Sequence, residues 1–274
     1  MEIAQGIHRI TVGQGAAPGL YATNTYMVIG SQGAAFVDTG WNREEDIKAR
    51  LDYIRQMGNP AMKGIAITHR HPDHMGGASA IHQATGGPII TSPVEKAPIE
   101  AALKDAKVDK VVQDGETLSL GNMTLEFVHA PGHTLGSMAV FIREKKALFT
   151  GDNVMGTGTS VVNPGEGDIA LYLQTMEKFL RYSPEVIYPG HGPVVKDTRA
   201  KLQGLINHRN EREQQVLGLL QKGPRSVEEM LKAIYDELDE RVQTMARNQI
   251  RSHLAKLEKE GKVTATGTDT YRLR

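Results

Sequence analysis

Four side chains that can bind a metal ion fall within six residues of this 274-residue chain. They are His69, His71, Asp73 and His74, directly after an apolar run over residues 64–68. Because side chains alternate along a strand, His69 and His71 are expected to point the same way and to reach one ion. Asp73 and His74 follow Pro72, where the chain can turn them toward a second ion. A lone histidine in a turn is usually structural, but four ligands at this spacing indicate a two-metal centre.

Two ions need more ligands than this cluster supplies, and three suitable side chains follow later apolar runs. They lie beside glycine at the expected ends of strands, where a bend permits close backbone approach; they are His133, Asp152 and His191. Seven side chains can serve two ions of about four or five ligands each, if one carboxylate bridges and a water completes the set. We predict His69, His71 and His133 on one ion and Asp73, His74 and His191 on the other, with Asp152 shared.

The other histidines lack such neighbours, and we predict structural roles for them. They are His8, His82, His129, His208 and His253, of which His129 is close enough to His133 in sequence to line the site. The chain has no cysteine, so disulfides are excluded and any metal must be held by nitrogen and oxygen. Such a ligand set accepts zinc, manganese or iron.

The composition is that of a globular protein, with 39% hydrophobic and 23% charged residues. The first residues do not resemble a secretory leader, and no apolar run approaches the roughly 20 residues of a membrane-spanning helix. We therefore expect a cytoplasmic protein that does not enter a membrane. The formal net charge is zero, which argues against a protein that coats nucleic acid.

Short apolar or β-branched runs, separated by Gly, Pro and Asn, predict the strands that must position these ligands. They cover residues 7–12, 25–30, 34–38, 64–68, 123–129, 137–142 and 147–150. Helices are expected from Asn42, with Glu45 completing a capping box, and over 76–84, 94–106 and 168–182. Strand pairs interrupted by helices predict two sheets packed face to face with helices outside, a four-layer α/β sandwich over residues 1–197.

After residue 197 the pattern changes to that of a small second domain, residues 198–274. A long polar helix is expected over 199–222, a second from an N-cap at Ser226 to about 236, and a third over 243–260. The last residues alternate like two short strands, so the sequence predicts a winged-helix-like domain. This segment has 15 Lys and Arg against 11 Asp and Glu, whereas residues 1–197 have 17 against 21.

The ligand residues, in this order, resemble the motifs of the metallo-beta-lactamase superfamily. Its HxHxDH motif matches His69–His74, and its later His, Asp and His match His133, Asp152 and His191. The segment Phe36–Gly40 resembles its first motif, whose aspartate, here Asp38, would orient a metal ligand. The resemblance covers roughly residues 1–197 and implies the αββα sandwich, with two zinc ions as the usual cofactor.

Three further segments resemble the branch that contains the endoribonuclease lactamase-beta-like protein. They are Asn24–Tyr26, Tyr188–Pro193 and His208–Glu213, the last followed by the winged-helix-like domain. That branch is also similar to fungal thioesterases that release polyketides from carrier proteins. The resemblance implies that the C-terminal domain leans over the mouth of the active site.

The expected activity is hydrolysis by a hydroxide held between two metal ions. The substrate is either a small thioester, ester or lactone, or single-stranded RNA, and fold membership does not choose between them. Asp73 is expected to accept a hydrogen bond from the nucleophile and to pass its proton on. An alternative is a metal-containing regulator whose winged helix binds DNA while the sandwich senses a ligand.

RNA binding would need basic or hydrogen-bonding side chains that reach phosphates. Helical positions in the C-terminal domain offer Arg209, Arg212, Arg247, Asn248 and Arg251. Exposed helices often carry such charges without binding anything, and acidic residues are interspersed here. An exported penicillin-degrading enzyme is not expected without a leader, and the C-terminal domain differs from that of glyoxalase-type thioesterases.

Overall fold

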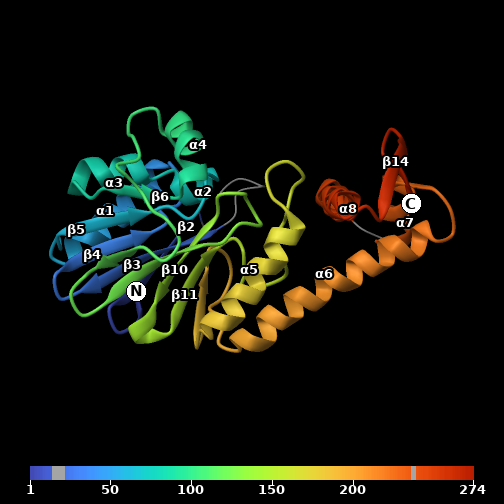
Figure 1. Ribbon diagram of the computed structural model, residues 1–274. Helices are drawn as coiled ribbons and strands as arrows, with labels where there is room; N and C mark the ends of the chain where they lie inside the picture. Colours follow the sequence, from blue (N-terminus) through green and yellow to red (C-terminus); the bar gives the residue numbers. More distant parts are fainter. Residues whose placement is uncertain (14–21, 236–238) are drawn as a thin grey trace. The chain divides into compact units, whose positions relative to one another are not determined.

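The computed structural model describes residues 1–13, 22–235 and 239–274, and the chain forms two compact units (Figure 1). The larger unit comprises Met1–Ala130, Gly136–Thr159 and Ser183–Thr198. The smaller unit comprises Pro131–Leu135, Ser160–Tyr182 and Arg199–Arg274. Because short segments around 133 and 170 pack with the C-terminal residues, the domain boundary near residue 197 stays a prediction.

A seven-stranded sheet occupies the first half of the larger unit, with its strands in sequence order. They are β1 (Glu2–Ala4), β2 (Ile7–Val12), β3 (Thr23–Gly30), β4 (Gly33–Val37), β5 (Met62–Ala66), β6 (Ile89–Thr91) and β7 (Lys110–Val111). Strands β1 to β4 pair antiparallel, and β4 to β7 pair parallel. The loops after β4 and β5 therefore leave the same edge of the sheet, which brings Asp38 near His69 and His74.

A second sheet of five strands has the order β12-β11-β10-β9-β8. The strands are β8 (Thr117–Ser119), β9 (Thr124–His129), β10 (Met138–Ile142), β11 (Ala147–Gly151) and β12 (Val186–Pro189). Strands β11 and β12 are parallel, so Asp152 and His191, which follow them, emerge at one edge. The predicted strands over 123–129, 137–142 and 147–150 are confirmed.

Apolar side chains from the two sheets meet in one buried cluster, which includes Tyr26, Val37, Phe127, Val140 and Phe149. The outer face of the first sheet is covered by α1 (Glu44–Gln56), α2 (Pro72–Met75), α3 (Ala78–Thr85) and α4 (Pro93–Leu103), as Figure 1 shows. A single helical turn over Arg143–Lys145 joins β10 to β11. Burial of these apolar faces at about 25 cal/mol per Å² is the main force that holds the layers together.

The predicted capping box at the start of α1 is wrong. The helix begins one residue later than Asn42 would allow, with Arg43 at the N-cap and no side-chain cap bond. The Glu45 carboxylate pairs instead with the Arg43 guanidinium. Because Glu45 forms this ion pair, its carboxylate does not cap the start of the helix.

In its described residues, the smaller unit contains four helices and a three-stranded sheet. They are α5 (Ile169–Tyr182), α6 (Thr198–Leu220), α7 (Val227–Ile234) and α8 (Glu240–Lys259), with β13 (Arg225–Ser226), β14 (Val263–Gly267) and β15 (Thr270–Leu273) in the order β13-β15-β14. Ser226 is the N-cap of α7, as predicted, and it also forms a complete capping box with Glu229. The predicted end of this helix near 236 lies outside the described residues. Apolar side chains of α6, α7, α8 and β14 form one core. None of the described helices is long and apolar enough to cross a membrane.

Candidate metal centre

Two histidines and two aspartates of the larger unit converge at the edge where β5, β11 and β12 end. The Nε2 atoms of His74 and His191 lie 3.4 Å apart. Asp152 Oδ1 lies 3.1 Å from the first of these nitrogens and 3.4 Å from the second. Asp73 Oδ2 lies 3.5 Å from His74 Nε2 and 3.1 Å from His191 Nε2. Imidazole nitrogens this close around carboxylates are typical of a cation site.

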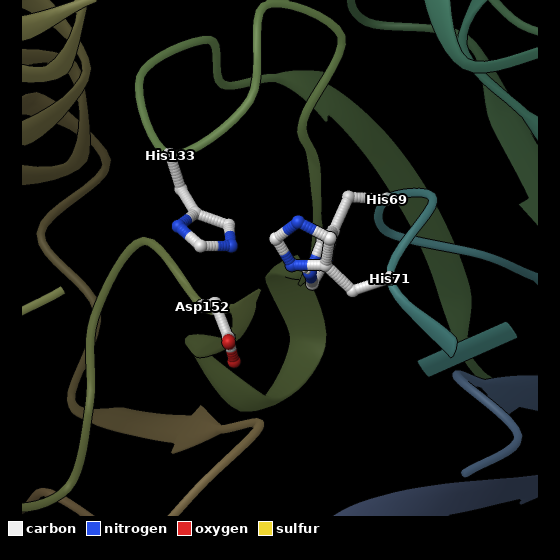
Figure 2. A group of neighbouring side chains, drawn as sticks. All are labelled: His69, His71, His133 and Asp152. Carbon is white, nitrogen blue, oxygen red and sulfur yellow. Dashed lines mark hydrogen bonds between the residues drawn. The ribbon is translucent and has the colours of Figure 1, made fainter. Parts of the chain in front are cut away.

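The seven ligand residues predicted from the sequence fall into two groups among the residues that the structure describes. One group is Asp73, His74 and His191, and the other is His69, His71, His133 and Asp152 (Figure 2). Within each group the ligand atoms all lie within 4.8 Å of one another. His69 Nε2 and His71 Nδ1, for example, are 3.0 Å apart. The two groups have the same members as the two ligand sets proposed from the sequence. Asp152 lies in one group and also beside His74 and His191 of the other.

The rings are oriented by hydrogen bonds at the nitrogen that turns away from the group. His74 Nδ1 lies 2.8 Å from Asp38 Oδ2, and His191 Nδ1 lies 2.8 Å from Ala22 O. His69 Nδ1 lies 3.0 Å from Thr68 Oγ1. A ring that donates from Nδ1 to an oxygen presents Nε2 as a lone pair, which is the tautomer that binds a metal. The donor set therefore fits divalent cations.

Asp38 holds several parts of this edge together. Its Oδ1 accepts from Thr68 N, and its Oδ2 accepts from Thr68 Oγ1 and faces His74 Nδ1, all at 2.8 Å. The backbone of Asp38 has a φ of 58°, a left-handed conformation that costs a non-glycine residue of order 1–3 kcal/mol. Such strain persists where surrounding contacts over-determine it, and here the contacts orient His74.

The electrostatic environment favours positive charge at this point. Burial lowers the pKa of His74, but Asp152, Asp73 and Asp38 raise it by more, so the pKa lies well above its usual value. The pKa of His191 is likewise lowered by burial and raised by Asp152 and Asp73, to about 9. Burial raises the pKa of Asp152, but His74 and His191 bring it well below its usual value. Divalent cations would take the place of these protons.

Gly190 leaves the space that this arrangement needs. A Cβ atom there would lie 2.5 Å from His74 Cε1 and 2.6 Å from Asp152 Oδ1. Gly190→Ala is therefore expected to push these ligands apart and to weaken metal binding by about 10- to 100-fold, the size found when the supports of metal ligands are removed. Competition with a chelator measures this affinity. Gly204→Ala, where a Cβ meets nothing within 4 Å, is the matched control; equal affinities in both variants would contradict the expectation.

Several supports of the site were not predicted from the sequence. Asn24 donates from Nδ2 to Pro189 O and Gly192 O, at 3.1 and 2.9 Å, and so holds the loop that carries His191. Arg70 makes two hydrogen bonds, of 2.8 and 2.9 Å, to the buried carboxylate of Glu95. Asn24 lies in a segment that resembles a family motif, but the resemblance gave it no role. No feature of the sequence around Glu95 indicated that it supports the site.

Arg50 is a further unpredicted support, fully buried on α1. Its Nη2 donates to Trp41 O at 3.0 Å. A Cβ on Gly77 would lie 2.3 Å from the same nitrogen, so the guanidinium packs directly against this glycine. Gly77 N in turn donates to Gly40 O at 3.0 Å. Arg50 thereby links the turn after Asp38 to the turn that follows His74.

The remaining histidines belong to neither ligand group within the described part of the chain. His8 bonds to Tyr53 and His82 to Gly87 O. His129 lines a cavity of about 120 Å³ with Phe127 and Met138. It has no place among the grouped ligands.

Arg209, one of the candidates for phosphate contact, is buried, with 2% of the residue exposed. Other basic residues of the smaller unit are engaged with neighbours. Arg247 pairs with Glu228, and Arg251 pairs with Asp269. The Arg212 guanidinium lies 4.4 Å from the centre of the Tyr235 ring. The smaller unit therefore offers less free positive charge than its sequence indicates.

Comparisons with known proteins place the two parts of the chain in known families. Residues 18–191 match the metallo-beta-lactamase superfamily, and residues 226–271 match the beta-lactamase associated winged helix domain. A beta-lactamase-like protein 2 homolog of Drosophila melanogaster is 31% identical over 264 residues, covering 89% of this chain and 85% of that protein. An atrochrysone carboxyl ACP thioesterase of Emericella nidulans is 31% identical over 258 residues, covering 92% and 78%.

Solved structures agree with this assignment of the fold. A beta-lactamase domain protein from Burkholderia ambifaria has a TM-score of 0.83 at 21% identity, covering 100% of this chain and 93% of its own. A metallo-beta-lactamase family protein from Thermus thermophilus has a TM-score of 0.79 at 22% identity, covering all of both chains. The fold predicted from the sequence, a metallo-beta-lactamase sandwich with a C-terminal winged helix, is confirmed. The chain belongs to the metallo-beta-lactamase superfamily.

Proposed function

We propose that this protein is a hydrolase with two divalent cations, most simply zinc, that cleaves thioesters or related activated esters of small carboxylic acids. The observation that carries the proposal is the orientation of the ligand rings. His69, His74 and His191 each have Nδ1 beside a protein oxygen, which leaves Nε2 for a metal. Bound there, the cations would supply a water of lowered pKa and polarise the scissile carbonyl.

The protein's own side chains would keep the ligands in place and move a proton. Asp38 fixes the ring of His74, and Asn24 fixes the loop of His191. Asp73 Oδ2 faces His191, while its Oδ1 makes no hydrogen bond within the part of the chain that the structure describes. This second oxygen is available to accept a proton from the attacking water and to deliver it to the leaving thiolate or alkoxide.

Two observations favour an acyl substrate over RNA. Arg209 is buried, and Arg247 and Arg251 are engaged in ion pairs, which reduces the charge available to phosphates. A relative that matches 92% of the chain is named as a thioesterase. The same ion pairs weigh against the alternative of a DNA-binding regulator, whose recognition helix would need these side chains.

A parallel activity screen tests the proposal. Zinc-loaded protein and its His71→Ala variant are assayed on acyl thioesters, lactones, a chromogenic lactam and single-stranded RNA. We expect thioester or lactone hydrolysis that the variant loses. His82→Ala is the matched control, since His82 belongs to neither ligand group of the described residues, bonds to Gly87 O and lies beside Asp109. Cleavage of RNA alone, lost in His71→Ala, would overturn the acyl substrate and keep the metal centre.

A further inference from the structure

The ring of His133 is held by a short segment that precedes α5. Its Nδ1 donates to Val161 O at 2.6 Å and lies 3.3 Å from Ser160 Oγ. A hydrogen bond at Nδ1 leaves Nε2 as the ligand atom of this residue. The position of Ser160–Val162 thus decides where the lone pair of His133 points.

This segment is itself held by two helices from the C-terminal part of the chain. From α8, Ser252 Oγ donates to Val162 O at 2.6 Å, and Gln249 Nε2 donates to the same oxygen at 3.1 Å. From α6, the Arg209 guanidinium donates to Ser160 O. The carbonyls of Ser160 and Val162 are therefore both clamped, one on each side of the carbonyl that binds His133.

Arg209 is built into this arrangement rather than exposed to a ligand. Its Nη1 donates to Gln249 Oε1 at 2.6 Å, which joins the two helices at the segment. Its guanidinium lies 5.0 Å from the centre of the Tyr172 ring. Only 2% of the residue is exposed. Burying an arginine is costly, and the hydrogen bonds from Nη1 and Nη2 offset part of that cost.

We propose that Arg209, Gln249 and Ser252 are positioning residues for the metal ligand His133, acting through the carbonyls of Ser160–Val162. This inference rests on the proposed function, and it gives the C-terminal helices an indirect role in orienting the ring of His133. Loss of the clamp would let the segment move and the ring of His133 rotate. Mutation of residues that orient a metal ligand typically lowers metal affinity by about 10- to 100-fold.

The test observes the ring of His133 itself. In zinc-loaded protein with ¹⁵N-labelled histidine, the Nδ1–H of His133 gives a protected signal, which His133→Ala identifies by its loss. We expect Arg209→Met and Ser252→Ala to shift or broaden this signal, and Arg209→Met to weaken zinc binding by about tenfold or more in chelator competition. The matched control is Lys256→Met, which breaks the Lys256–Glu213 pair between the same helices without touching Ser160–Val162.

The outcomes separate this inference from the proposed function. If Arg209→Met and Ser252→Ala fold and keep both the His133 signal and the zinc affinity, while His133→Ala loses zinc, the inference is wrong and the metal centre stands. If His133→Ala keeps its zinc and its activity, the ligand assignment fails and the inference with it. Should Arg209→Met not fold, Ser252→Ala decides, because it removes a single hydroxyl.

Discussion

Replacing Asp152 with asparagine is expected to remove hydrolysis and most of the bound metal. Asp152 Oδ1 lies 3.1 Å from His74 Nε2 and 3.4 Å from His191 Nε2, and the residue also belongs to the group with His69, His71 and His133. One carboxylate thus serves both groups. Asparagine keeps the size of the side chain and loses the negative charge that would balance two cations. A loss of about 4 kcal/mol in transition-state stabilisation corresponds to about 10³-fold in kcat/KM.

The measurement pairs kinetics with metal analysis of the Asp152→Asn protein after dialysis. We expect the metal content per chain to fall from about two to one or less. Asp52→Asn is the control, because Asp52 lies on the surface of α1 between Lys48 and Arg55. Circular dichroism confirms that both variants are folded. An Asp152→Asn protein that keeps two metal ions and its activity would refute the bridging role.

The sequence indicated the candidate ligands because four of them are clustered and the others follow apolar strands beside glycine. His69 and His71 lie in the bend after β5, which ends at Ala66, so the strand alternation expected for them is wrong, although both join one group. Asp152 and His191 follow β11 and β12, and the parallel pairing of these strands brings them to one edge. Periodicity and glycine placement are local signals, so one sequence suffices to find them.

Several residues that hold the candidate ligands, unlike Asp38, carry no local signal of that role. Glu95 is 25 residues from Arg70, and Asn24 is 165 residues from Pro189. In the sequence, Arg209 is one of several charged residues on a polar helix. In the structure it is buried and donates to Ser160 O. Such pairs depend on how distant segments pack, which composition and period do not encode.

The same reasoning explains the limits of the fold prediction. Long strands such as β2 and β10 show a clear pattern, and their predicted ranges agree with the structure. Strands β6, β7 and β8 have three, two and three residues, too few for a period to be read. The capping box predicted at Asn42 is absent because the Glu45 carboxylate, which it required, pairs with the Arg43 guanidinium.

The role of Asp73 is separable from metal binding by a second substitution. Its Oδ2 lies 3.1 Å from His191 Nε2 and accepts from Thr23 Oγ1 at 3.3 Å, so the carboxylate is fixed in place. The amide of Asp73→Asn keeps an oxygen for these contacts and cannot take up a proton from water at neutral pH. Proton transfer by a positioned group contributes about 10²- to 10⁴-fold to turnover.

Turnover in Asp73→Asn is therefore expected to fall by about 10²-fold or more, with KM changed only a few-fold, since the lost interaction belongs to the transition state. Steady-state kinetics on the thioester or lactone found in the screen gives both constants, and metal analysis of the same sample gives the ion content. The exposed Asp105→Asn is the control. If kcat falls only in proportion to lost metal, Asp73 is a ligand alone, and the proton must travel by another group; if kcat is unchanged with full metal, the carboxylate has neither role.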